Sequence, residues 1–247
     1  MSDPRDVVVK RGHAPGATAA EAAGLRWLAA AGTVAVPEIR GQDDETLVID
    51  RVPAGRASAP AAERFGRGLA GLHAAGAPAF GSLPPEGAAD AWIGLAPMVN
   101  VPSAEWASWY ASDRVLPYVR RAVDAGTFDA SEAAVFERAC ARIPASAEPP
   151  ARLHGDLWTG NVLWDGREAW LIDPAAHGGH RETDLAMLHL FGCPHLDRVV
   201  AAYDEAAPLA DGWRDRIGLH QLFPLLVHTV LFGRSYAGQA VAAARSF

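Results

Sequence analysis

The sequence predicts an α+β fold with two unequal lobes, a small β-rich lobe at the N-terminus and a larger, mainly helical lobe after it. Within the first 50 residues, short apolar runs rich in β-branched residues are interrupted by one helical stretch. The segment 50–55 then breaks regular structure, so we place the boundary between residues 1–52 and residues 53–247. Beyond this boundary, apolar residues recur mostly at helical spacing.

Composition narrows the class of protein. The chain has 247 residues, enough to bury a substantial core, and its formal net charge is −7. This acidic charge gives no indication of binding to nucleic acid or to an anionic membrane surface, so we expect neither as a partner.

The two cysteines, Cys140 and Cys193, have no paired spacing, which favours a reducing compartment. Residues 1–10 are too polar for a signal peptide, and the longest apolar run, 222–232, is about half a bilayer span, so we predict a cytoplasmic protein.

The N-terminal lobe is expected to begin with a strand over residues 7–10 and a helix from Thr18 to about Ala31. The strand ends in Lys10, and Glu21 lies in the first turn of the helix. Thr18 and Glu21 form a capping-box pattern, in which the glutamate would satisfy a backbone N–H group. Lys10 and Glu21 could instead face each other as an ion pair, and both interpretations stay open at this point.

Two more strands, over residues 34–39 and 46–49, complete the expected small lobe. A polar turn over residues 41–44 joins them. Asp50 opens the irregular segment that crosses to the second lobe. This crossing segment could offer backbone groups to the base of a bound nucleotide.

The larger lobe is expected to be mainly helical. Phe65, Leu69 and Leu72 mark a first helix, and His73 beside its apolar face is interpreted as a core histidine. Residues 76–102 are rich in glycine and proline and predict a long loop. The expected helices span residues 61–74, 104–125 with Ser103 as its cap, 131–143, 182–191, an apolar pair over 213–232 bent at Pro224, and a final alanine-rich stretch.

The centre of the chain predicts a β-hairpin. Short apolar strands over residues 162–164 and 169–172 flank Asp165-Gly166, which is a strong turn signal. Asn161 precedes the first strand and Asp173 follows the second. The hairpin should therefore bring these two side chains close together.

Asp156, Asn161 and Asp173 follow one another at intervals of five and twelve residues. Protein kinases place an aspartate, an asparagine five residues later, and another aspartate just after the next strand. There the first carboxylate takes a proton from the attacking hydroxyl, while the other two side chains hold Mg²⁺ against the phosphates of ATP. Each residue alone could be an ordinary turn residue, but all three at this spacing predict phosphoryl transfer. Lys10 and Glu21 then match the pair that grips phosphate oxygens.

Two histidines after the hairpin, His177 and His180, invite a zinc interpretation. Their spacing matches no zinc pattern with cysteine or glutamate partners, and a Gly-Gly pair separates them, so zinc is not predicted. Asp184 lies near the start of the helix expected over residues 182–191. We expect it to support the backbone of the loop 154–161.

Longer motifs narrow the prediction to a family. His154-Gly-Asp-Leu-Trp-Thr-Gly-Asn161, Leu171-Ile-Asp-Pro-Ala175 and Gly179-His-Arg-Glu-Thr-Asp-Leu-Ala-Met187 closely resemble the fructosamine kinase (ketosamine-3-kinase) family, and shorter matches extend along nearly the whole chain. The resemblance implies a two-lobed protein-kinase-like fold. It also implies ATP- and Mg²⁺-dependent phosphorylation of a sugar hydroxyl on a ketosamine, an amine adduct of a sugar. In that family, phosphorylation at the third sugar carbon makes the adduct unstable, so the amine is released and glycation is repaired.

The resemblance also implies roles for six residues: the catalytic base Asp156, the metal ligands Asn161 and Asp173, the ATP-binding residues Lys10 and Glu21, and the substrate-binding residue Trp158. We further predict that Asp50 contributes to ATP binding and His154 to substrate binding, which makes eight predicted site residues. The expected substrate is a small-molecule sugar amine or a glycated protein side chain.

One departure concerns the glycine-bearing loop that ordinarily covers the ATP phosphates in this family. Only nine residues precede Lys10 and none is glycine, so the small lobe is expected to be N-terminally shortened, either because the gene model starts late or because this branch works without that cover. The loss of such a cover would weaken ATP binding or slow turnover. Two alternatives stay open: a related phosphotransferase for an aminoglycoside-like or choline-like acceptor, and a degenerate kinase that binds nucleotide without turnover.

Overall fold

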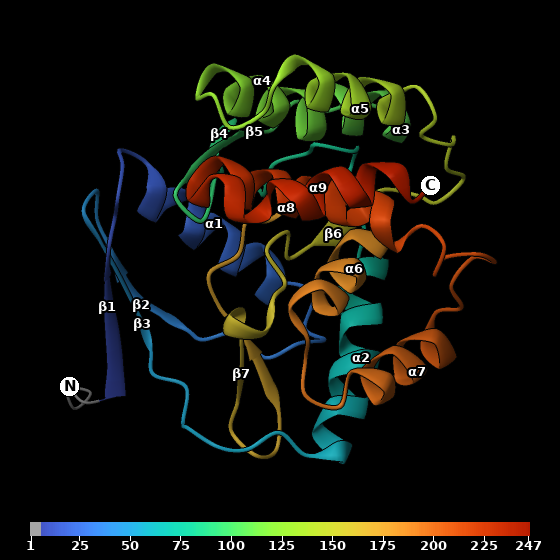
Figure 1. Ribbon diagram of the computed structural model, residues 1–247. Coiled ribbons are helices and arrows are strands. Elements are labelled where there is room, and N and C mark those ends of the chain that lie inside the picture. Colours follow the sequence, from blue (N-terminus) through green and yellow to red (C-terminus); the bar gives the residue numbers. More distant parts are fainter. Residues whose placement is uncertain (1–5) are drawn as a thin grey trace.

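A computed structural model describes residues 6–247, so residues 1–5 of the predicted small lobe lie outside the described residues. In Figure 1 the strands β1, β2 and β3 stand together at the left with helix α1 beside them, and the remaining helices form a larger mass. The chain is therefore α+β and two-lobed, as predicted. The division at residue 52 stays a prediction.

The small lobe is a three-stranded antiparallel sheet in the order β1–β3–β2, with one helix packed on it. Leu25 on the helix contacts Leu47 and Ile49 on the central strand, and these residues form a small core of their own. Lys10 lies opposite Leu47 in the sheet register. The elements are β1 (Val7–Arg11), α1 (Ala17–Ala29), β2 (Ile39–Gln42) and β3 (Thr46–Asp50).

The strand predicted over residues 34–39 is wrong. Only Ala35 makes an isolated bridge there, to Trp170 of the large lobe, and the regular strand begins at Ile39. Pro37 accounts for the difference, because proline has no N–H group to donate to a strand ladder. The segment therefore connects the two lobes instead of extending the sheet.

Helices make up most of the large lobe. In Figure 1, α8 and α9 lie between α3, α4 and α5 on one side and α6 on the other, while α2 packs against α7. Within residues 6–247, none of these helices has both the length and the apolar composition of a membrane span. The helices are α2 (Ala59–Ala74), α3 (Trp106–Trp109), α4 (Leu116–Asp124), α5 (Ala130–Cys140), α6 (Glu182–Phe191), α7 (Leu196–Ala206), α8 (Ile217–Phe232) and α9 (Arg234–Arg245).

Two helix predictions need correction. The helix expected over residues 104–125 begins at Trp106 without a side-chain cap, so Ser103 does not cap it. A π-helical stretch, Tyr110–Val115, also separates α3 from α4. Helix α7 was not predicted at all.

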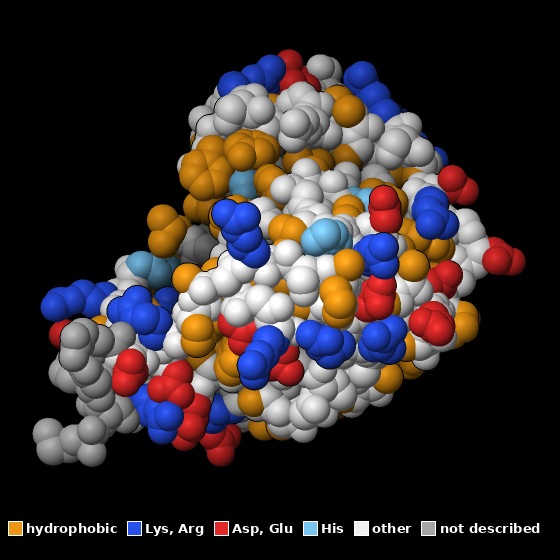
Figure 2. All heavy atoms as spheres, turned by 90° about the horizontal axis from the view of Figure 1, so that it is seen from below, with side chains coloured by type: hydrophobic (Ala, Val, Ile, Leu, Met, Phe, Trp, Pro, Cys, Tyr) orange, Lys and Arg blue, Asp and Glu red, His pale blue; other side chains and the backbone are white. Residues whose placement is uncertain are grey.

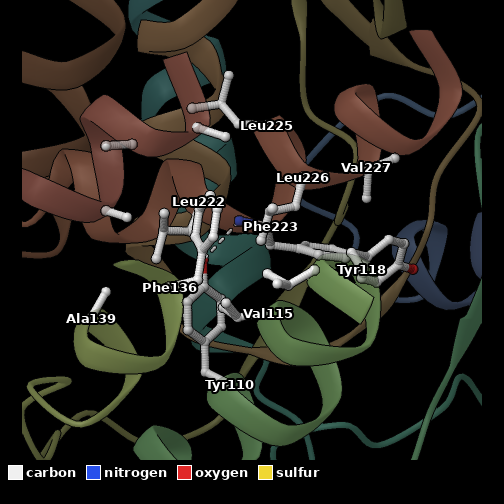
Figure 3. Packing of buried hydrophobic residues seen from close by; sticks show 14 of the residues in the cluster. Tyr110, Val115, Tyr118, Phe136, Ala139, Leu222, Phe223, Leu225, Leu226 and Val227 are labelled. Atoms are coloured by element: carbon white, nitrogen blue, oxygen red, sulfur yellow. Dashed lines mark hydrogen bonds between the residues drawn. The ribbon is translucent and has the colours of Figure 1, made fainter. Parts of the chain in front are cut away.

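The helix pair predicted over residues 213–232 is instead the single helix α8, with Pro224 inside it. Proline lacks an N–H group and normally kinks or breaks a helix. The buried hydroxyl of Tyr110 lies at this position: it is 2.9 Å from the carbonyl of Leu219 and 3.4 Å from that of His220, which lacks the N–H partner at Pro224, and it accepts from the N–H of Phe223 at 3.2 Å. Figure 3 shows Tyr110 and Phe223 meeting in the core between the helices.

Short two-stranded sheets complete the large lobe. The β7–β8 hairpin confirms the one predicted around Asp165-Gly166. A second hairpin, β4–β5, corrects the expectation that residues 76–102 form a loop throughout, and the pairing of β6 with β9 was not predicted. The strands are β4 (Asp90–Ile93), β5 (Ala96–Val99), β6 (Ala151–Leu153), β7 (Val162–Trp164), β8 (Ala169–Leu171) and β9 (His177–Gly179).

Candidate active site

A cavity of about 400 Å³ lies between the lobes. Its walls come from β1 and α1 of the small lobe and, in the large lobe, from β4, the loop after β6, the segment after β8 and the C-terminal end of α8. In Figure 2 the molecule is hollowed between the small lobe at the lower left and the large lobe, with hydrophobic side chains gathered along one edge of the hollow. Six of the eight predicted site residues line the cavity: Lys10, Glu21, Asp156, Trp158, Asn161 and Asp173.

Asp156 and Asn161 are joined by a short 3₁₀ turn, which brings their side chains together. The side-chain amide of Asn161 donates to the backbone carbonyl of Asp156 at 2.9 Å and to its carboxylate at 3.1 Å. The same amide nitrogen reaches the backbone carbonyl of Asp173 at 3.4 Å. Because all three bonds use the nitrogen, the amide oxygen of Asn161 is left as a possible metal ligand.

Asp173 follows β8 with a backbone φ of 54°, in the left-handed region that residues other than glycine rarely adopt. Its carboxylate contacts the ammonium group of Lys10, which also pairs with Glu21 on α1. Burial alone would lower the pKa of Lys10, but the two carboxylates outweigh this effect and raise it. Helix α1 has no side-chain cap, so Glu21 forms the ion pair and not the capping box.

The carboxyl group of Asp156 lies in a setting that disfavours its charged form. Burial raises its pKa to about 7, and the negative charges of Asp173 and Asp184 act in the same direction. The hydrogen bond from Asn161 opposes this rise. A carboxyl group with a pKa near neutrality is well matched to take a proton from a hydroxyl and release it afterwards.

Asp184, in the first turn of α6, is buried outside the lining of the cavity and holds this loop. Its carboxylate accepts hydrogen bonds from the backbone N–H of His154 at 2.8 Å and of Gly155 at 3.0 Å. It also lies 3.2 Å from Nε2 of His73, whose Nδ1 meets a buried tyrosine hydroxyl. These contacts confirm that Asp184 supports the loop and that His73 is a core histidine.

Two of the predicted site residues are not brought to the cavity. His154 is fully buried, with Nε2 at 2.9 Å from the carbonyl of Ile172 and Nδ1 accepting from the N–H of Asp156 at 3.2 Å. Its side chain therefore fixes the backbone that carries Asp156 and is not among the residues that line the cavity. Asp50 ends β3, where its carboxylate binds the guanidinium group of Arg40 at 2.6 Å, outside the residues that line the cavity.

Trp158 lines the cavity and is 39% exposed. Its indole lies against the backbone of Gly160, because a Cβ atom added there would come within 2.3 Å of the ring. Phe191, at the end of α6, meets the indole edge-on with the ring centroids 6.1 Å apart. The ring is thus held by two neighbours while it remains open to the cavity.

Several residues that line the cavity were not among the predicted site residues. Trp92 on β4 lines it, although this segment was expected to be loop, and His228 and Phe232 line it from the end of α8. Trp92 also touches the small lobe, with its ring centroid 4.9 Å from that of His13. The sequence does single out His228, because this residue interrupts the longest apolar run.

A second buried group of polar side chains lies outside the cavity. Among the described residues, His180, Glu182 and His220 place possible ligand atoms within 4.8 Å of one another. The carboxylate of Glu182 is already paired with Arg216 at 2.9 Å, and Nε2 of His180 contacts Ser146 at 3.0 Å. The guanidinium charge already neutralises the carboxylate, so we assign this group a structural role.

Comparisons with known proteins agree with this geometry. Residues 7–246 match the family model for fructosamine kinase. An Enterococcus faecium protein assigned as a ketoamine kinase is 35% identical over 176 residues, which cover 69% of this chain and 61% of the length of that protein.

Comparison with solved structures also supports a kinase-like fold. A Thermobifida fusca protein assigned as a fructosamine-3-kinase is 49% identical and has a TM-score of 0.89, over 97% of this chain and 84% of that one. The gentamicin complex of the phosphotransferase APH(2'')-IIa has a TM-score of 0.63 at 12% identity, over 98% of this chain and 85% of that one, which shows a shared fold alone. This protein therefore belongs to the fructosamine kinase family and has the two-lobed fold of protein-kinase-like phosphotransferases.

Proposed function

We propose that this protein is an ATP- and Mg²⁺-dependent kinase that phosphorylates a sugar hydroxyl of a ketosamine. The observation that carries the proposal is the convergence of Asp156, Asn161 and Asp173 in one cavity, facing the ammonium group of Lys10. Membership of the fructosamine kinase family supports a ketosamine, free or on a protein side chain, as the acceptor. Release of the amine after phosphorylation would make the enzyme a deglycating one.

The donor atoms in the cavity fit a hard divalent cation. The amide oxygen of Asn161 and the carboxylate of Asp173 are the oxygen ligands that Mg²⁺ prefers. When bound, Mg·ATP supplies the phosphoryl group and a cation that offsets its charge. Lys10 would hold phosphate oxygens, and Glu21 would keep the ammonium group of Lys10 in place.

Asp156 would act on the acceptor. Its carboxylate would take the proton of the sugar hydroxyl as that oxygen attacks the terminal phosphorus. The hydrogen bond from Asn161 fixes the orientation of this carboxylate. Trp158 offers a broad apolar surface beside it, against which the carbon skeleton of the sugar could pack.

A coupled assay for ADP tests the proposal with three acceptors: a fructosamine, an aminoglycoside and choline. We expect Mg²⁺-dependent turnover with the fructosamine. Turnover with either of the other two and none with the fructosamine would replace the assigned substrate class. Stabilisation of the fold by Mg·ATP without turnover of any acceptor would instead indicate a degenerate kinase.

A further inference from the structure

His228 gives the cavity a hydrogen-bonding group that the proposed phosphoryl transfer does not use. It lies near the C-terminal end of α8 and lines the cavity. Its Nδ1 is 2.7 Å from the backbone carbonyl of Pro224, one helical turn earlier. Because a carbonyl oxygen can only accept a hydrogen bond, Nδ1 must carry the hydrogen.

The other ring nitrogen of His228 is then an acceptor. Burial lowers the pKa of His228 below its ordinary value of 6.5, and the bond to Pro224 opposes this only in part, so the imidazole is neutral. A neutral imidazole with hydrogen on Nδ1 has a lone pair on Nε2. Within residues 6–247, Nε2 has no hydrogen-bond partner and is not sealed away from solvent.

Three aromatic rings lie close to the His228 ring. The centroid of the His228 ring lies 4.8 Å from that of Phe191, 4.9 Å from that of Tyr236 and 5.6 Å from that of Phe232. Phe191 in turn contacts Trp158, so the cluster extends to the loop that carries the proposed base. The wall of the cavity at α8 is formed by Val227, His228, Leu231 and Phe232, so it presents one neutral acceptor on an apolar surface.

Carboxylates also line the cavity. Among the described residues that line it, the acidic ones are Glu21, Asp156 and Asp173. Glu21 and Asp173 contact Lys10, which would hold the phosphates, while Asp156 accepts from Asn161 and would act on the acceptor hydroxyl. A cationic group on the acceptor that turned toward α8 would find His228 and the ring of Phe232.

We propose that His228 recognises the amine of the ketosamine by accepting a hydrogen bond from the protonated nitrogen through Nε2. This inference rests on the proposed function, in which the acceptor sugar carries an amine. An alkylamine is protonated at neutral pH, and its N–H group can donate to a neutral imidazole. The ring of Phe232, which also lines the cavity, would add attraction for the positive charge.

The test compares two acceptors that differ only at this nitrogen, 1-deoxy-1-(methylamino)fructose and its ether analogue 1-O-methylfructose. Binding is measured by calorimetry and turnover is measured separately. We expect wild type to bind the amine about 10- to 100-fold more tightly, the range for a hydrogen bond to a charged group. His228→Phe should lose this preference and bind the ether as wild type does, with the loss of turnover appearing in KM.

Two further variants sharpen the comparison. His228→Gln keeps an acceptor oxygen and should retain part of the preference, while Tyr236→Phe keeps the ring cluster and should retain all of it. Thermal unfolding checks that each variant is folded, and His228→Leu replaces the phenylalanine variant if that one is unstable.

Equal binding of the two acceptors by wild type, or an unchanged preference in His228→Phe, would overturn the inference. Binding and turnover are separate readouts, so the two proposals can fail independently. A preference for the amine that depends on His228, without any phosphate transfer, would overturn the proposed function and leave this inference standing.

Discussion

The carboxylate of Asp184 accepts a hydrogen bond from the backbone N–H of His154 at 2.8 Å, although 30 residues separate the two in sequence. Its second oxygen accepts from the N–H of Gly155 at 3.0 Å. Helix α6 is thereby fastened to the backbone just before Asp156. The position of the proposed base thus depends on a residue that never reaches the cavity.

Replacing Asp184 with asparagine should weaken the fold and the activity together. The new amide nitrogen would face a backbone N–H group, which leaves a buried donor without a partner. We expect the free energy of unfolding to fall by about 1–3 kcal/mol and kcat to fall by roughly 10- to 100-fold, as for other supporting residues. Urea unfolding and steady-state kinetics measure the two effects. A folded variant with wild-type kcat would show that the loop does not need this anchor.

Gly160→Ala should displace the indole of Trp158, because the added Cβ would come within 2.3 Å of it. A misplaced substrate contact should raise the KM for the sugar acceptor by roughly tenfold or more, while the KM for ATP stays close to that of wild type. Gly41→Ala is the matched control, since a Cβ there meets nothing within 4 Å. An unchanged acceptor KM in Gly160→Ala would argue against a substrate role for Trp158.

Lys10 and Glu21 should behave as one unit. Lys10→Met is expected to lower kcat/KM for ATP by roughly 10²- to 10³-fold, as does the loss of other charge-stabilising donors. Glu21→Gln should have a smaller effect, and the double variant should be no worse than Lys10→Met, because Glu21 acts through the ammonium group of Lys10. Additive losses in the double variant would show separate roles.

Glu182 should make the fold sensitive to acid. Burial alone would raise its pKa, but hydrogen bonds from His220 and Arg216 hold it at about 2, below the ordinary value of 4.5. A carboxylate with a depressed folded-state pKa stabilises the fold above the unfolded-state pKa, and this contribution is lost as pH falls toward the folded-state value. His220, kept neutral by burial, acts in the same direction because acid must charge it.

Thermal unfolding as a function of pH measures this contribution. The midpoint of wild type should fall as pH decreases from about 4.5 to about 2. Glu182→Gln should be less stable at neutral pH and should show a shallower slope over that interval. Parallel curves for the two proteins would contradict the assignment of the depressed pKa to Glu182.

Short stretches of sequence were sufficient to predict some helices and strands and insufficient to predict others. The β7–β8 hairpin is encoded by the turn residues Asp165-Gly166, so a short window was enough to predict it. Helix α7 was not predicted because the residue before it, His195, is not a usual N-cap residue and adopts a left-handed φ of 56°. The β4–β5 hairpin depends on distant partners, such as the hydroxyl of Tyr118, which donates to the carbonyl of Pro97 at 2.9 Å.

Some features of the candidate site could likewise be predicted from the sequence, and others could not. The spacing of Asp156, Asn161 and Asp173 predicted their convergence, because one hairpin links them. The burial of His154 depends on a carbonyl 18 residues away and could not be read from the motif. His228 lines the cavity only because of where α8 packs in the large lobe. The spacing of apolar residues along a helix does not show which other elements that helix will contact.

The rate of phosphate transfer from Mg·ATP to a fructosamine in a single turnover, compared between wild type and Asp156→Asn, tests the central claim most directly. We expect the variant to be slower by roughly 10²- to 10⁴-fold, the range for loss of a general base. Its affinity for Mg·ATP should be unchanged, because Asn161 and Asp173 remain. Asp124→Asn, at an exposed aspartate that ends α4, serves as the control and should transfer phosphate at the wild-type rate. Equal transfer rates in wild type and Asp156→Asn would contradict the assignment of the base.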